Sequence, residues 1–242
     1  MLSVLFAVIS LLYATVGQAG GTAFLALMAF ASFPPVEMRP TALLLNIVAA
    51  TYSTWLFNRG RLVDWTKLRP LLAASLPAAL VGGSIVLDAN LYKALTGVVL
   101  LLAAAILAVG HVRQGEDRSM PLRGAFAVGA AVGLVSGLTG VGGGIFLAPI
   151  LITLRWASPK QTAALSAPFI LANSVLGFLG AAYAGQAPSE QTWLYALAAL
   201  VGAMLGTMIG LRWLSERMTR CALAAILGMA GLQLLLLPYL RT

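Results

Sequence analysis

The sequence has little of the chemistry on which enzymes and metal proteins depend. It contains one histidine, His111, one cysteine, Cys221, and only 9% charged residues. A single cysteine excludes an internal disulfide, and one residue of each kind cannot form an ordinary structural zinc site. The glycine-rich segments have neither a preceding strand pattern nor a following Lys-Ser or Lys-Thr, so they match no dinucleotide fingerprint or P-loop. We therefore expect no catalytic residues, no metal, no cofactor and no enzymatic activity.

Apolar residues, in contrast, dominate the chain. They make up 60% of the sequence, and the mean hydropathy is +0.95, far above that of soluble domains. A membrane barrel would need short alternating strands, whereas these apolar runs are long and do not alternate. The net charge of +8 comes from Lys and Arg between the apolar runs, where they orient the chain in a bilayer. We predict an all-α integral membrane protein that contacts the lipid bilayer and no nucleic acid.

Glycine gathers at one place in the chain. Residues 137–149, GLTGVGGGIFLAP, include five glycines within eight residues in the middle of a long apolar run. Each glycine lowers helix stability by about 1 kcal/mol relative to alanine, so the stretch predicts an interrupted membrane helix. A weaker copy, GQAGGTAFLA, occupies residues 17–26. An offset of 123 residues places Gly20 on Gly143, which indicates two related halves.

The apolar segments support this division. The first segment of each half, residues 1–33 and 122–154, would be about 50 Å long as one helix, against a hydrocarbon core of about 30 Å. A pair of half-helices that turns at the glycines and leaves on the same side fits that length. Segments of ordinary spanning length follow at residues 41–57, 68–87, 91–109, 162–183, 193–211 and 219–237. The same ungapped offset pairs Gly83 with Gly206.

Loop charges predict how the halves are oriented. Residues 58–69 carry four Lys or Arg and one Asp, whereas the matching loop, residues 184–192, carries one Glu and no basic residue. The bias is reversed for residues 88–93 and their counterpart, which contains Arg212, Arg217 and Arg220. Lys and Arg favour the cytoplasmic side. We predict two inverted repeats, each a re-entrant pair plus three transmembrane helices, with both termini outside. The N-terminal repeat is 1–110, the cytoplasmic linker 111–121 and the C-terminal repeat 122–242.

Inverted repeats with broken helices place a substrate site where the half-helix N-termini meet, and such N-termini favour anions. The candidate substrate-binding residues are Gln18, Gly20, Gly21, Thr22, Thr139, Gly142, Gly143 and Gly144, flanked by Asn46 and Asn173. The alternative is that the glycines only allow helices to approach closely, an interpretation we give to Gly202 and Gly206.

Polar side chains in the spans should face the interior of the bundle. Those that follow the breaks are Asn46, Thr51, Ser53, Ser166, Asn173 and Ser174. No charged residue lies in the middle of a predicted span, and Arg39 is expected at a segment end within reach of water. An anion would then be held by backbone N–H groups and neutral side chains, without a carboxylate relay for protons.

At these residues the sequence resembles the sulfite exporter TauE/SafE family of membrane permeases. The resemblance is carried by GLTGVGGGIFLAPIL followed by SPKQTAALSAPFILANS, by GQAGGTAFLALM followed by PPVEMRPTALLLN, and by RGRLVDW. It covers nearly the whole chain. The first half departs from the pattern where Ala19 interrupts the glycine run and where Ala26 replaces the proline of the second half. The resemblance implies transport of small sulfur-containing anions, usually outward across the bacterial inner membrane.

We therefore predict a secondary transporter that exports sulfite or an organosulfonate across the bacterial inner membrane by alternating access. Two alternatives remain open. One is an anion channel with the same interior, and the other is a non-transporting membrane scaffold or subunit whose glycines only pack helices. The expected partners are a small anion and the lipid bilayer, and the oligomeric state is left open.

Overall fold

The computed structural model of the chain describes residues 2–15, 17–109 and 118–210, together with residues 228–229, 231–232 and 234–236. Within these residues every secondary-structure element is an α-helix, which confirms the predicted all-α class. The helices are α1 (Leu2–Ala14), α2 (Gly21–Phe30), α3 (Pro35–Arg59), α4 (Trp65–Ser84), α5 (Ala89–Val109), α6 (Leu122–Thr139), α7 (Gly144–Thr153), α8 (Pro159–Tyr183) and α9 (Thr192–Gly210). His111, Cys221 and most of the last predicted segment lie outside the described residues.

Five of the described helices, α3, α5, α6, α8 and α9, are long and apolar enough to cross a membrane. The protein is therefore a multi-pass membrane protein, as predicted. Helix α4 has 20 residues but does not belong to this group, because Lys67 and Arg69 lie near its start and lower its hydropathy. Helices α1, α2 and α7 are apolar but have only 10–17 residues each.

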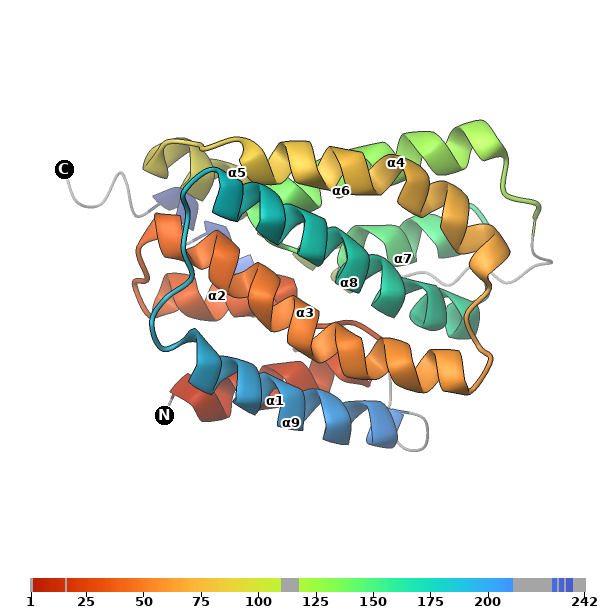
Figure 1. The fold of residues 1–242 in the computed structure, drawn as a ribbon, viewed down its shortest axis with the longest axis horizontal. Helices are drawn as coiled ribbons and strands as arrows, with labels where there is room; N and C mark the ends of the chain where they lie inside the picture. The colour runs from red at the N-terminus through yellow and green to blue at the C-terminus, as the bar shows by residue number, and fades with distance from the viewer. Residues whose placement is uncertain are drawn as a thin grey trace.

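Both long apolar segments are interrupted at the predicted glycines. The first is divided into α1 and α2, and the second into α6 and α7. In Figure 1 the start of α1 and the connection from α2 to α3 lie at the same end of the bundle, on the left. The start of α6 and the connection from α7 to α8 lie at the opposite end, on the right. Each pair thus enters and leaves the bundle at one end.

Backbone features repeat along the chain. Helices α2 and α7 are 123 residues apart at both their first and their last residues. Ser32 and Arg155, also 123 apart, share a left-handed conformation with φ values of 57° and 59°. Helices α3 and α8 are 124 residues apart. Compared with the segment from Ser32 to the start of α3, the segment from Arg155 to the start of α8 is therefore one residue longer.

This extra residue changes one predicted pairing. A Cβ atom on Gly82 would meet the main-chain oxygen of Leu134, and one on Gly206 would meet that of Leu11. Leu11 and Leu134 are 123 residues apart in matching half-helices. Gly206 therefore corresponds to Gly82, and the ungapped pairing with Gly83 is wrong by one position.

Helix packing is reciprocal between the halves. The most extensive contacts of α6 are with α4 and those of α1 are with α9, while α3 packs against α8. Close approach depends on glycine: Gly133 and Gly137 on α6 face the backbone of α4, and Gly202 on α9 faces the backbone of α1. Helix packing is thus the observed role of Gly202 and Gly206, as predicted.

The connections gather at the two ends of the bundle. At one end, Lys67 Nζ donates to the Trp156 main-chain oxygen over 2.8 Å, and Arg118 N donates to the Arg155 oxygen over 2.6 Å. The start of α4 and the connections before α6 and α8 therefore lie together. At the other end, Ser189 N donates to Thr41 Oγ1 over 3.0 Å, which places the connection before α9 beside the start of α3.

Candidate functional site

Both breaks use glycine where the backbone turns in a left-handed conformation. Gly17 and Gly140, which match in the two halves, have φ values of 74° and 87°. Gly20 and Gly143, the N-caps of α2 and α7, have φ values of 107° and 81°. An L side chain is strained at such angles. Ala19 does not have a positive φ, whereas its counterpart Gly142 has a φ of 83°, so the two breaks differ in backbone conformation where the alanine departs from the family pattern.

The half-helices that follow the breaks begin inside the protein without a side-chain cap. Neither Gly20 nor Gly143 provides a side-chain hydrogen bond to the first turn of its helix. Gly21 and Gly144, the first residues of α2 and α7, are buried. The first N–H groups of a helix have no partner within the helix and carry a partial positive charge. Two such N-termini in the interior are a candidate site for an anion.

Side chains of the first half contact the break of the second half. Gln18 Nε2 donates to the Gly144 main-chain oxygen over 3.3 Å, and Asn46 Nδ2 donates to the Gly140 oxygen over 3.2 Å. A Cβ atom on Gly142 would lie 2.8 Å from Asn46 Nδ2. One on Gly21 would collide with both Asn46 and the backbone of the second break. The structure therefore brings the two breaks together around Asn46.

The hydroxyl groups predicted for the site are buried and already hydrogen-bonded. Thr22 Oγ1 lies 2.8 Å from the Tyr13 hydroxyl, on the facing half-helix. Thr139 Oγ1 donates to the Val135 main-chain oxygen over 2.7 Å and accepts from Val141 N over 3.4 Å. These hydroxyls hold the turns of the breaks in this conformation. The side-chain amides of Gln18 and Asn46 are likewise already hydrogen-bonded, to main-chain oxygens of the second break.

Asn173 lies on α8, about one turn beyond the residues that touch the second break. Its Nδ2 donates to the Phe169 main-chain oxygen over 2.8 Å, and its Oδ1 is buried without a hydrogen-bond partner in the described residues. Phe169 and Ile170 are the α8 side chains close to Gly143 and Gly142. The described contacts therefore include none between Asn173 and a break.

One polar residue predicted to face the interior does not. Thr51 is exposed, and its hydroxyl donates to the Ile47 main-chain oxygen over 2.6 Å. A threonine on a helix can bond in this way to the preceding turn, so it does not need a partner in the bundle. The other members of the set, Asn46, Ser53, Ser166, Asn173 and Ser174, are buried.

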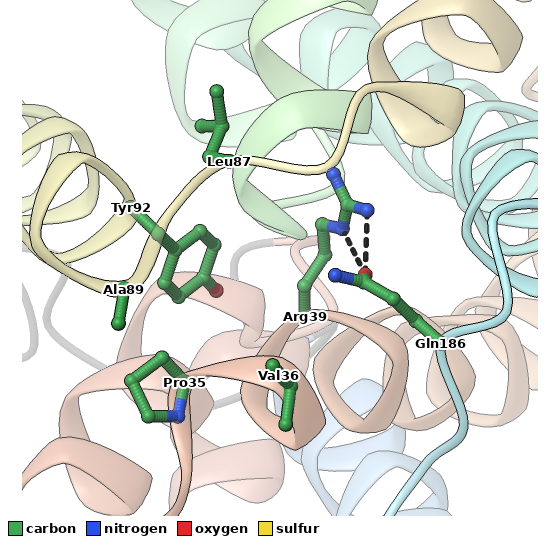
Figure 2. Close-up of a pocket in the computed structure, with 7 residues that line it drawn as sticks. All are labelled: Pro35, Val36, Arg39, Leu87, Ala89, Tyr92 and Gln186. Atoms are coloured by element: carbon green, nitrogen blue, oxygen red, sulfur yellow. Dashed lines mark hydrogen bonds between the residues drawn. The ribbon is translucent and has the colours of Figure 1, made fainter.

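Sequence reasoning missed a charged residue close to the second break. Arg39 was expected to reach water, but the described helix α3 begins at Pro35, and the side chain of Arg39 is only 1% exposed. Its backbone packs against Gly140. Its Nε and Nη2 both donate to Gln186 Oε1, over 2.8 and 2.5 Å, and Figure 2 shows this pair beside Tyr92. The signal in the sequence was Pro34-Pro35, since proline favours the first turn of a helix.

No group of three or more His, Cys, Asp or Glu residues could hold a metal ion within the part of the chain that the structure describes. The polar groups of the site are thus backbone N–H groups, amides and hydroxyls, with one arginine nearby. Such donors bind oxygen atoms of small anions.

Comparisons with known proteins place this chain among membrane transporters. The family model described as sulfite exporter TauE/SafE matches residues 2–234. The chain is 36% identical over 240 residues to the probable membrane transporter protein y4hK of Sinorhizobium fredii, covering 97% of both chains. It is 25% identical over 191 residues to the probable membrane transporter protein YunE of Bacillus subtilis, covering 70% of this chain and 68% of that one. No solved structure matches. The chain is therefore a membrane transporter that belongs to the sulfite exporter TauE/SafE family.

Proposed function

We propose that this protein exports a small sulfur-containing anion, such as sulfite or an organosulfonate, across the bacterial inner membrane. The observation that carries the proposal is the pair of buried, uncapped half-helix N-termini at Gly21 and Gly144. Their N–H groups can donate to the oxygens of an anion without the help of a charged side chain. The description of the matching family supports sulfite as the first substrate to test.

We also propose that the two halves are inverted repeats, with boundaries at residues 1–110 and 122–242 around a cytoplasmic linker. Three observations support the inversion: reciprocal helix packing, opposite directions of α3 and α8 in Figure 1, and sorting of the connections to two ends. Two similar halves of opposite orientation can exchange conformations, which is the basis of alternating access in many transporters.

The binding residues would be Gln18, Thr22, Asn46, Thr139 and the glycines at positions 20, 21, 142, 143 and 144, with Asn173 at the edge. In the described conformation the amides of Gln18 and Asn46 donate to carbonyls of the second break. A bound anion would accept hydrogen bonds from these amides in place of the carbonyls. Its binding would therefore loosen the contact between the two breaks. This exchange would couple substrate binding to movement of one half against the other.

Export needs no second ion in this mechanism. An anion that leaves a cell with a negative interior gains about 2.3 kcal/mol per charge per 100 mV. The membrane potential could then drive export of the anion directly, without a coupled ion.

The first experiment is a thermal-shift panel on detergent-purified protein with sulfite, sulfate, thiosulfate, sulfoacetate, taurine and simple carboxylates. A ligand that binds only the native state must raise the melting temperature. We expect the largest shift with sulfite or a sulfonate. No shift with any anion of the panel would contradict the proposal.

The second experiment measures uptake of radiolabelled sulfite by proteoliposomes. Gly143→Leu should abolish uptake while the protein still inserts, because the leucine would occupy the space where the backbone approaches the anion. A Cβ atom at this position would already lie 2.9 Å from Val132 Cγ1. A channel would instead show flux that does not saturate and no counter-exchange. A scaffold would show no flux in the wild type.

A further inference from the structure

Arg39 is a buried cation whose observed partners are all neutral. Its side chain is 1% exposed. Besides Gln186 Oε1, the guanidinium donates to the main-chain oxygens of Ile85 over 2.8 Å and Gly82 over 3.4 Å. These are all of its acceptors within the described residues, and none is a carboxylate. A buried positive charge without a negative partner is costly, and in a membrane protein such a residue points to a functional role.

Two acidic residues in the adjoining segments, Asp88 and Glu37, accept no hydrogen bond from Arg39. Asp88, in the connection before α5, accepts instead from the N–H groups of Asn90 and Leu91 over 2.9 and 3.0 Å and so caps α5. Glu37 lies on the first turn of α3 and is half-buried. The charge of Arg39 is therefore available to a mobile anion.

A small pocket adjoins the guanidinium. Its lining includes Arg39, Gln186, Tyr92 and Val36, and its volume is about 20 Å³. Val36 is 56% exposed, so the pocket lies at the surface of one end of the bundle. In Figure 2 the amide nitrogen of Gln186 points toward the side of Tyr92, while its oxygen faces Arg39. A volume of this size holds about one water molecule, so an oxyanion cannot enter until Gln186 moves.

The geometry of the Arg39–Gln186 pair resembles the recognition of an anion. One oxygen accepts from both Nε and Nη2, the edge of the guanidinium that binds oxyanions in bidentate fashion. Gln186 lies in the connection between α8 and α9, which starts after Tyr183 and ends before Thr192. A connection can move more easily than a packed helix, so this oxygen can be exchanged for one of an anion.

We propose that Arg39 forms a second anion-binding site, at the end of the bundle where the connections before α3, α5 and α9 meet, and that Gln186 occupies it when that end is closed. This proposal rests on the anion transport proposed above. Arg39 adjoins the second break through Gly140, and Tyr92 donates to the Thr139 main-chain oxygen over 3.0 Å. An anion that leaves the breaks would therefore meet Arg39 next, and its binding would release Gln186 and open this end.

The test uses three variants of the full chain, purified and reconstituted in proteoliposomes with radiolabelled sulfite. Gln186→Ala removes the competing oxygen. Gln186→Glu places a carboxylate against the guanidinium. Ala187→Glu is the matched control, because Ala187 is exposed and the substitution adds the same charge to the same connection.

Gln186→Ala should lower the half-saturating sulfite concentration by about tenfold, the change expected when one oxygen that competes for a charged group is removed. Gln186→Glu should reduce sulfite flux by about tenfold or more, because its carboxylate and the substrate compete for one cation. It should also melt at or above the wild-type temperature, which shows that it is folded. Ala187→Glu should stay within about twofold of wild type, as expected for an exposed charge.

Each outcome is decisive. If Gln186→Glu and Ala187→Glu have equal flux, or if Gln186→Ala keeps the wild-type half-saturation, Arg39 binds no substrate anion and the pair is only a structural contact. If these variants behave alike while Gly143→Leu abolishes uptake, only this inference fails. If the wild type takes up no sulfite and shows no thermal shift, the proposed function fails and this inference with it.

Discussion

Asn46 of the first half donates a hydrogen bond of 3.2 Å from its side-chain amide to the main-chain oxygen of Gly140 in the second half. Gly140 is the C-cap of α6, and the last carbonyls of a helix have no partner within it. Asn46 thus stabilises the end of the half-helix that leads into the second break. Its Oδ1 is buried without a hydrogen-bond partner in the described residues, so this oxygen can still accept a hydrogen bond.

Asn46→Ala should therefore reduce both stability and anion binding. Loss of the hydrogen bond leaves a buried carbonyl without its partner, which costs about 1–3 kcal/mol. We expect a lower melting temperature in detergent and the loss of the shift that sulfite produces in the wild type. Thr51→Ala, on the same helix but exposed and bonded only to its own helix, is the control and should change neither quantity. A normal sulfite shift in Asn46→Ala would remove this residue from the site.

The breaks could be predicted from the sequence because their physical cause is local. Glycines at positions 17, 20, 140 and 143 adopt left-handed conformations that other residues avoid. The two apolar segments are also too long for one crossing and too short for two. The glycines and the length of the apolar segment can both be read from one short stretch of sequence, without knowledge of which helices pack together.

The environment of Arg39 could not be predicted in this way. Its acceptors come from the end of α4 and from the connection before α9, 43 to 147 residues away in sequence. Burial by distant segments leaves no periodic pattern around Arg39 itself. The pairing of Gly83 with Gly206 was wrong for a different reason: Gly82 and Gly83 are adjacent, so a shift of one residue still pairs glycine with glycine.

Gly133 on α6 offers a test of glycine as a packing residue outside the breaks. A Cβ atom there would lie 2.7 Å from Ser75 Cα on α4, and backbone atoms cannot move aside cheaply. Gly133→Ala should destabilise the protein by about 1–3 kcal/mol through overpacking, although alanine favours a helix by about 1 kcal/mol.

The control is Gly60→Ala. Gly60 has a φ of −76°, and an added Cβ atom would make only ordinary contacts, none closer than 3.4 Å. Thermal unfolding in detergent compares the two variants. Equal melting temperatures would show that α4 and α6 can separate enough to admit a methyl group.

Asp64 should give the connection before α4 a stability that depends on pH. Its carboxylate accepts from Thr66 Oγ1, over 2.7 Å, and from the N–H groups of Thr66 and Lys67, over 3.1 and 3.3 Å. The hydrogen bond from the Thr66 hydroxyl is the main reason that the pKa of Asp64 lies below its usual value. The folded state thus holds the ionised form more strongly than the unfolded state does.

The sign of the pH effect follows from that lowered pKa. The contribution of Asp64 is fully present above the unfolded-state pKa of about 3.9 and disappears as the pH falls through the lower folded-state pKa. Asp64→Ala should cost about 1 kcal/mol at neutral pH, as loss of an N-cap does, and the difference from wild type should shrink below about pH 4. Melting temperatures of both proteins from pH 7 to pH 3 measure this. Asp64→Asn, which cannot ionise, should show no such trend relative to Asp64→Ala.

The orientation of the two ends can be tested by cysteine labelling in cells, with Cys221→Ser as the background. Ser119 is exposed beside Arg118, which is hydrogen-bonded to Arg155 at the end rich in basic residues. Ala187 is exposed in the connection that contacts the start of α3 at the opposite end.

Because Lys and Arg favour the cytoplasmic side, Ser119→Cys should react with an impermeant maleimide only after the membrane is permeabilised, whereas Ala187→Cys should react in intact cells. The two sites lie at opposite ends of one bundle, so a spanning protein must expose them on opposite sides. Labelling of Ser119→Cys from outside would reverse the predicted orientation. It would also place the Arg39 pocket on the cytoplasmic side, where an exported anion enters.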